Sequence, residues 1–218
     1  TFNENFFVDN FKKRLNRFVV ETESGRRCHL HDPGRLEELL YPGAPLYMVE
    51  KSRGLKCEIY FTKKNNEYVL INSKIHSDIA GNIINSDLFK DFKIRRKEVK
   101  INKSRIDFLL DHKNREFYLE VKGCTLTKNG VALFPDAPTE RGKRHMEELE
   151  YLIEKGYEGG VMFLVFRKSE YFSPNWETDP QFSEALKKAY NIGLKIFPVQ
   201  IYFDGKNIYA ENLLKIKI

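Results

Sequence analysis

The sequence predicts a small closed β-barrel followed by an α/β domain, and three observations support this fold class. Residues up to about 72 form short apolar runs separated by turn signals. Beyond them, strand-like runs alternate with long helical segments. The 218 residues, 41% of them hydrophobic, suffice for two apolar cores. We therefore expect a barrel over residues 1–76 and an α/β domain over residues 77–218.

Five strands with one helical interruption are expected in the barrel. The strands fall at residues 17–22, 26–30, 45–50, 56–62 and 68–71. A hairpin turn is expected at Asn65-Asn66, and a short helix at residues 34–41, where Pro42-Gly43 would end it. An OB-fold fits this order of elements, and an SH3-like barrel is the alternative, because hydrophobic periodicity does not separate the two.

The second domain is expected to begin with a helix from Ser77-Asp78 to about Phe89, which has apolar residues on one face. Three strands follow it, at residues 93–101, 104–111 and 115–122. A long helix at residues 139–155 and an apolar strand at 160–167 come next, and then a second helix at 179–191 and two strands at 195–203 and 207–210. The apolar strand indicates a sheet covered on both faces. We therefore expect an α/β sandwich with helices on both sides of its sheet.

Three acidic residues are expected to line up across the three neighbouring strands of this sheet. Two-residue turns at 102–103 and 113–114 would set the registers of both hairpins. In these registers Glu98 lies opposite Asp107, and Asp107 lies opposite Glu120. Like charges directly opposite one another destabilise a sheet, and burial would raise the pKa values of these carboxyl groups. The row of acids therefore needs a cation.

A divalent cation would remove this repulsion. Mg²⁺ or Mn²⁺ would bind Asp107 and Glu120, with Glu98 as a weaker or water-mediated ligand. Lys122 follows Glu120 by two positions and shares its face of the strand. Its charge would orient a water or stabilise a phosphodiester under attack, so the expected catalytic residues are Asp107, Glu120 and Lys122. The alternative is a solvent-facing row of charges, which the apolar residues beside Asp107 and Glu120 disfavour.

The net charge of +6 favours a polyanionic partner, and we expect DNA, bound with weak sequence preference. The expected nucleic-acid contacts are Lys12, Lys13, Arg14, Arg17, Arg35, Arg95, Arg96, Arg105, Arg141 and Lys143. Residues 90–105 hold eight basic and two acidic residues, and the alternative for this run is a solvated edge strand protected by its lysines. Phe11 and Phe18 lie among basic residues, a pattern that single-strand binders use to stack bases, but the two rings are expected in the core. His145 is likewise expected in the core, with a catalytic role as the alternative.

Three widely spaced cysteines predict no disulfide framework and a reducing, cytoplasmic environment. Cys28-His29-Leu30-His31 lacks the spacing of a zinc site, so ordinary packing is expected there. No apolar run approaches the roughly 18 residues that span a bilayer, so no membrane partner is expected. The sequence leaves open whether the chain forms a homodimer.

An Asp followed a hairpin later by Glu-x-Lys resembles the pattern of PD-(D/E)xK nucleases, with Ile106 where that pattern has proline. More closely, the chain resembles the sugar fermentation stimulation protein A family. The matching segments are residues 11–18, 32–36, 104–110, 120–122, 134–142, 172–174 and 179–180. The resemblance implies an OB-like domain, a PD-(D/E)xK-like α/β domain, DNA binding and a regulatory link to sugar use. An active Mg²⁺-dependent nuclease is the alternative, whereas the sequence shows no signature of a sugar-phosphate enzyme.

Overall fold

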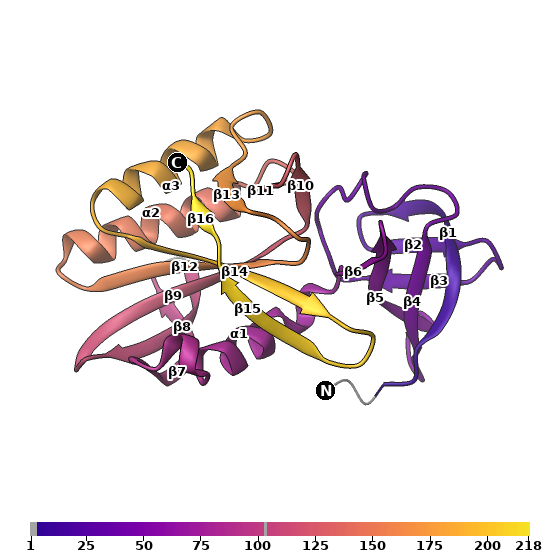
Figure 1. The fold of residues 1–218 in the computed structure, drawn as a ribbon, viewed down its shortest axis with the longest axis horizontal. Helices are drawn as coiled ribbons and strands as arrows, with labels where there is room; N and C mark the ends of the chain where they lie inside the picture. The colour runs from indigo at the N-terminus through magenta and orange to yellow at the C-terminus, as the bar shows by residue number, and fades with distance from the viewer. Residues whose placement is uncertain (1–3, 103) are drawn as a thin grey trace.

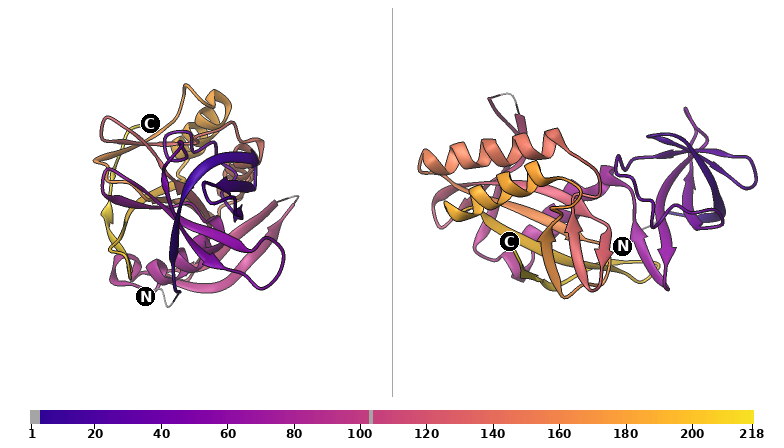
Figure 2. Two further views of the ribbon diagram at one scale, coloured as in Figure 1. Left: turned by 90° about the vertical axis from the view of Figure 1, so that its right-hand side faces the viewer. Right: turned by 90° about the horizontal axis from the view of Figure 1, so that it is seen from above.

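A computed structural model describes residues 4–102 and 104–218, so Lys103, part of the basic run, lies outside the described residues. A β-barrel precedes an α/β domain, as predicted, and the two lie side by side (Figures 1 and 2). No helix within these two ranges is long and apolar enough to cross a membrane.

The barrel contains one strand more than expected. Its strands are β1 (Phe7–Asn16), β2 (Val19–Thr22), β3 (Arg27–Leu30), β4 (Pro45–Glu50), β5 (Cys57–Lys64) and β6 (Glu67–Leu70). They follow the order β3-β2-β1-β4-β5-β6, and pairing of β3 with β5 closes the barrel. Strand β1 escaped the sequence reasoning because Phe11 is its only fully buried residue, which leaves little alternation to detect.

The short helix expected at residues 34–41 is absent, and turns occupy this segment. Leu36 has a φ of 54° in the left-handed region, which a continuous right-handed helix does not allow. The amides of Leu39 and Leu40 both bond to the Leu36 carbonyl, so the segment makes one tight turn. The loop before it is thereby directed toward the second domain, where the Leu36 amide meets Asp136.

The α/β domain has helices on both faces of a six-stranded sheet. The strands, in the order β15-β14-β12-β9-β8-β7, are β15 (Ile208–Leu213), β14 (Lys195–Phe203), β12 (Glu158–Val165), β9 (Arg115–Cys124), β8 (Ser104–His112) and β7 (Phe92–Ile101). Helix α1 (His76–Ile84) covers one face, and α2 (Glu140–Glu154) and α3 (Pro180–Asn191) cover the other (Figure 1). Helix α1 is shorter than expected, since it ends at Ile84 before the 3-10 turn Asp87–Phe89.

A second small sheet was not predicted. It consists of β10 (Leu126–Lys128), β11 (Val131–Phe134), β13 (Tyr171–Pro174) and β16 (Lys215–Ile216). These strands have two to four residues, too few to show a period of two in the sequence. The sheet leads the chain from β9 to α2, and so it places the segment that contains Asp136 beside the end of β9.

Both predicted hairpin registers are confirmed. Ile101 pairs with Ser104 in the first hairpin, and Phe108 pairs with Leu119 in the second. The first ladder is irregular, however, with a register shift between Ile94 and Arg96. The predicted starts of α2 and α3 are also confirmed: Thr139 caps α2 and Asp179 caps α3 by accepting backbone N–H bonds. The predicted start of α1 at Ser77-Asp78 is wrong, because the helix begins at His76 and its N-cap, Ile75, makes no side-chain hydrogen bond.

The two domains share one apolar core. Phe61 of the barrel stacks on Phe203 of β14, with ring centroids 4.1 Å apart. The cluster around this stack continues through the barrel interior and along the face of the sheet that α1 covers. Burial of this common apolar area holds the domains in a fixed relative position. A cavity between them is therefore a stable feature of the fold.

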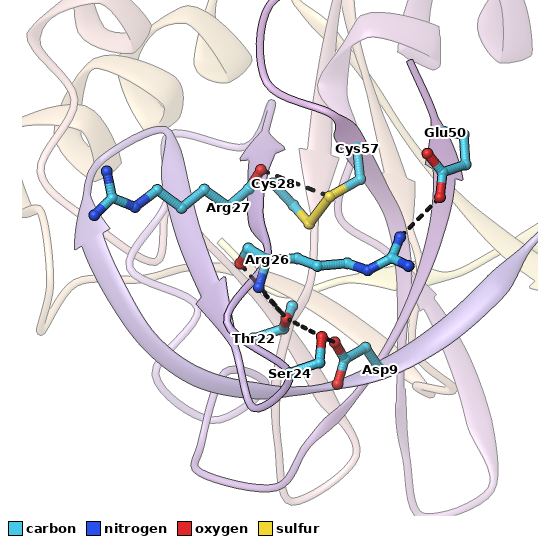
Figure 3. A network of polar contacts seen from close by, with 8 residues as sticks. All are labelled: Asp9, Thr22, Ser24, Arg26, Arg27, Cys28, Glu50 and Cys57. Atoms are coloured by element: carbon cyan, nitrogen blue, oxygen red, sulfur yellow. Dashed lines mark hydrogen bonds and ion pairs between the residues drawn. A yellow bond between two sulfur atoms is a disulfide. The ribbon is translucent and has the colours of Figure 1, made fainter. Parts of the chain in front are cut away.

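The expectation that no disulfide forms is wrong. Cys28 and Cys57 form a disulfide between β3 and β5, at the seam that closes the barrel (Figure 3). Around it, Arg26 and Glu50 form an ion pair at 2.7 Å (Figure 3). The pairing escaped the sequence reasoning because the two cysteines are 29 residues apart, and only the closed barrel brings them together. The side chain of Cys28 is fully buried, but it is held by this disulfide as well as by the ordinary packing that was expected.

Reduction of this disulfide is expected to lower the melting temperature. A cross-link spanning 29 residues restricts the unfolded chain, which stabilises the native state by about 3 to 4 kcal/mol in the chain-entropy model. Thermal melts of the wild type with and without a strong reductant measure the effect, and a Cys28→Ser variant should not respond. An unchanged melting temperature after thiol counting has verified reduction would contradict the expectation.

Candidate metal centre

A cavity of about 340 Å³ lies between the two domains. The end of β9, the start of α2 and the barrel loop at residues 32–34 form its walls. Charged residues from both domains line it: Asp107, Glu120, Lys122, Asp136 and Arg141 from the α/β domain, and Arg17 and Asp32 from the barrel. The structure therefore brings together the three expected catalytic residues, Asp107, Glu120 and Lys122.

Glu120 is the most deeply buried of these acids, with 3% of its side chain exposed. Its Oε1 accepts hydrogen bonds from Lys122 Nζ and His145 Nδ1. Burial acts to raise the pKa of Glu120, but Lys122 and His145 outweigh it and lower that pKa below its ordinary value. The second oxygen, Oε2, is buried and has no hydrogen-bond partner among the residues that the structure describes. A residue that lines the cavity thus has one anionic oxygen left unsatisfied.

Asp107 lies close to Glu120 and carries the opposite pKa shift. Burial and the negative charge of Glu120 raise the pKa of Asp107 to about 7. Its Oδ2 accepts the backbone N–H of Val121 at 2.7 Å, which fixes the carboxyl group against β9. Two carboxyl groups that repel one another beside an unsatisfied oxygen fit a hard divalent cation, which would complete its shell with water or phosphate oxygens. Within the described ranges, no third His, Cys, Asp or Glu joins them as a ligand group.

Glu98 does not belong to this group, which corrects the expected ligand set. It faces Asp107 in register, yet its φ of 54° interrupts the extended strand. Its side chain is 68% exposed and forms an ion pair with Arg105 at 3.0 Å. The left-handed backbone at Glu98 thus turns its side chain away from the two buried carboxyl groups.

Arg14 has a different role from the phosphate contact expected of it. Both of its terminal nitrogens are engaged by the protein's own backbone, so the guanidinium fixes the barrel loop beside the cavity. The carbonyls that accept its hydrogen bonds are those of Arg17 at 2.6 Å, Gly34 at 2.7 Å, Arg35 at 2.9 Å and Asp32 at 3.1 Å.

Of the other expected nucleic-acid contacts, Arg17 and Arg141 line the cavity. Arg35 and Arg96 are exposed at the surface. The rest have acidic neighbours: Lys12 and Lys13 pair with Glu21, Arg95 with Asp111 and Glu116, Arg105 with Glu98, and Lys143 with Glu147. Exposed pairs of this kind are weak and exchange readily with a phosphate. Their contact with nucleic acid stays a prediction.

Sequence reasoning missed two aspartates of the cavity. Burial, with a contribution from Asp136, raises the pKa of Asp32 to about 6. Asp136 forms a hydrogen bond between the domains, because its Oδ2 accepts from the Leu36 amide of the barrel loop at 3.2 Å. A Cβ atom on Gly34 would lie 2.4 Å from that oxygen, so only glycine allows this approach. Both aspartates lie in segments on which the family resemblance rests, at residues 32–36 and 134–142, but no chemistry was assigned to them.

Two histidines complete the site. His145, expected in the core, is buried there and also orients Glu120 through Nδ1. His76, at the start of α1, packs its ring against Gly123, where a Cβ would lie 2.2 Å from Cε1. Burial lowers the pKa of His76 to about 4, so its imidazole is neutral at pH 7.

Family comparisons match this architecture. A family model described as the SfsA N-terminal OB domain matches residues 13–71, and one described as the sugar fermentation stimulation protein RE domain matches residues 74–207. The chain belongs to the sugar fermentation stimulation protein family. The barrel of this SfsA-family chain is therefore an OB domain, and the SH3-like alternative is set aside.

Similar proteins cover nearly the whole SfsA-family chain. Curated sugar fermentation stimulation protein homologues from Methanothermobacter thermautotrophicus and Sulfolobus acidocaldarius are 45% and 46% identical to it, over 92% and 97% of this chain and 88% and 91% of theirs. Among solved structures, that of Pyrococcus furiosus SfsA in complex with Ca²⁺ matches with a TM-score of 0.91 and 26% identity, covering 98% of this chain and 96% of the other.

The raised pKa of Asp107 makes a pH dependence testable in metal-free protein. The native state binds this proton more tightly than the unfolded chain, whose carboxyl has the ordinary value of 3.8. Stability is therefore lost as the pH rises from about 4 through about 7, by up to roughly 4 kcal/mol. Asp107→Asn should remove this loss, so that the variant gains stability over the wild type between pH 5 and 8.

Urea unfolding at several pH values in EDTA measures the difference. Asp78→Asn, which changes an exposed carboxyl on α1, is the control and should shift stability by less than about 0.5 kcal/mol at every pH. A difference between wild type and Asp107→Asn that does not change with pH would show that Asp107 titrates normally.

Proposed function

We propose that this protein binds DNA and holds a divalent cation at Asp107 and Glu120, where a backbone phosphate of the DNA would meet the ion. The observation that carries this proposal is the buried Oε2 of Glu120, which has no partner among the described residues. Asp107, whose pKa is raised, lines the same cavity as Glu120. Arg17 and Arg141 line the same cavity and supply positive charge for phosphates. The arrangement of Asp107, Glu120 and Lys122 is of the PD-(D/E)xK type.

A solved relative supports the choice of cation. The P. furiosus SfsA structure is described as a complex with Ca²⁺, a hard ion that prefers oxygen ligands. Carboxylates and phosphate oxygens are such ligands. We propose Mg²⁺ or Mn²⁺ for this chain, because two carboxylates with several waters suit these smaller ions.

Each side chain of the site has a separate role in this proposal. Asp107 and Glu120 would hold the cation, which when bound polarises a phosphodiester and lowers the pKa of a water. His145 keeps Glu120 in place by donating from Nδ1 to its Oε1. Lys122 contacts the same oxygen and lies 3.1 Å from His145 Nδ1, so its ammonium group is fixed in the cavity wall beside the phosphate position.

The alternative is an active Mg²⁺-dependent nuclease, and the position of Lys122 favours it. A protein that only binds DNA has little use for a lysine held beside two carboxylates, whereas phosphodiester hydrolysis needs a charge to stabilise the transition state. The family description names sugar fermentation stimulation, and we include in the proposal that DNA binding serves the control of sugar use.

Metal binding is expected to raise the melting temperature of the wild type. A ligand at a hundredfold excess over its Kd adds about 2.7 kcal/mol of stability. Asp107→Asn should respond little to millimolar Mn²⁺. Glu98→Gln is the matched control, because Glu98 is exposed and turned away, and it should respond like the wild type. Equal shifts in the wild type and Asp107→Asn would contradict the proposed ligands.

DNA affinity is expected to fall steeply with salt, because clustered basic residues would displace counterions from the phosphates. The logarithm of affinity should change with the logarithm of salt by about −0.9 per phosphate contact on duplex DNA. Titrations of labelled DNA at several salt concentrations measure this slope, and a flat response would rule out the proposed interface.

Cleavage, if the alternative holds, should depend on both metal and Lys122. Incubation of plasmid and single-stranded DNA with Mg²⁺, Mn²⁺ or EDTA tests for it. Lys122→Ala should keep the Mn²⁺-induced melting shift but lose cleavage, because lysine is not a ligand. Cleavage that persists in EDTA or in Lys122→Ala would exclude this mechanism.

A further inference from the structure

Phe18 is an exposed aromatic ring next to Arg17, a residue that lines the cavity, although the sequence predicted the ring in the core. Its side chain is 45% exposed, whereas Phe11, seven residues earlier in the chain, is buried as expected. A large apolar ring left in water forgoes burial energy of about 25 cal/mol per Å². A single exposed aromatic ring is common on protein surfaces, so a binding role for Phe18 has to be argued from the residues around it.

The backbone around Phe18 is held on both sides. Its amide donates to Asn16 Oδ1 at 2.9 Å, and its carbonyl accepts from the Leu30 amide at 2.9 Å. The preceding carbonyl, of Arg17, accepts from the Arg14 guanidinium at 2.6 Å. These bonds fix the ring at the turn between β1 and β2, so a ligand would meet it already ordered.

The Phe18 ring, two histidine rings and the Arg17 guanidinium lie next to one another and are together called the platform below. The Phe18 ring lies nearly parallel to the His29 imidazole, at 15° with centroids 6.3 Å apart. His29 in turn contacts His31 edge to face at 4.0 Å, and His31 lies 3.4 Å from the buried Glu58. The Arg17 guanidinium lies 5.9 Å from the centroid of the Phe18 ring.

Arg17 connects this platform to the metal centre. Its Nε donates to the Pro33 carbonyl at 3.1 Å, which holds the side chain at the loop beside the cavity. The same residue lines the cavity that contains Asp107 and Glu120. One guanidinium therefore reaches both the aromatic ring and the cavity rim, where it can pair with a phosphate between them.

We propose that Phe18 is a stacking platform for an unpaired base of single-stranded DNA, whose neighbouring phosphate Arg17 directs toward the cavity. This inference rests on the proposed function and adds the form of its substrate. A base within a duplex has both faces covered by its neighbours, so only an unpaired base can offer a face to Phe18. Stacking of this kind tolerates any base, and therefore gives affinity without sequence preference.

Oligonucleotides with and without bases separate stacking from phosphate binding. The probes are a fluorescent twelve-residue thymidine strand and an abasic strand of the same length and charge, titrated by anisotropy in Ca²⁺. The wild type should bind the thymidine strand about tenfold more tightly, as expected for one well-stacked base. Phe18→Ala and Phe18→Leu should lose this difference, since leucine keeps apolar volume but has no aromatic face. Phe18→Trp should keep it.

Tyr190→Ala is the matched control, because Tyr190 is 42% exposed on α3 and does not line the cavity. It should bind both strands like the wild type. The inference is overturned if Phe18→Leu retains the preference for thymidine, or if Phe18 variants weaken both strands equally. Wild type that binds a duplex of the same length but neither single strand would overturn the stacking platform alone, as would salt-sensitive binding without base preference. Wild type that binds neither single strand nor the duplex would overturn the proposed function as well.

Discussion

The buried carboxylate of Glu120 is the constraint on which the rest of the site depends. A charge with 3% of its side chain exposed persists only where other charges compensate its lost hydration. Lys122 on β9 and His145 on α2 do this at Oε1, which links the central sheet to the helix that covers it. Oε2 has no such partner in the described structure, and Asp107 adds negative potential beside it. Packing therefore leaves one oxygen of Glu120 uncompensated, and this is the position at which we propose a cation.

The second constraint is the contact between the domains. Arg14 binds four backbone carbonyls and so gives the loop after β3 a fixed shape, and Asp136 then accepts an amide of that loop from the other domain. Gly34 leaves room for this approach. A cavity built in this way has one wall from the OB domain and the others from the α/β domain, so DNA held by the barrel would lie beside the two carboxyl groups.

Local signals in the sequence were enough for much of this structure. Turn residues set both hairpin registers, which brought Asp107 opposite Glu120, and Asp179-Pro180 marked the start of α3. The errors have physical causes that no local pattern reveals. Glu98 leaves the site because its backbone enters the left-handed region, and Phe18 is exposed because it lies at a turn. Cys28 and Asp136 meet their partners only when distant segments fold together.

The most direct measurement of the central claim is the anomalous diffraction of crystals soaked in Mn²⁺. We expect one peak within coordination distance of both Asp107 and Glu120 Oε2, with Lys122 outside the ligand shell. An ion bound instead at Asp32 and Asp136, or no peak at a concentration that shifts the melting temperature, would contradict it.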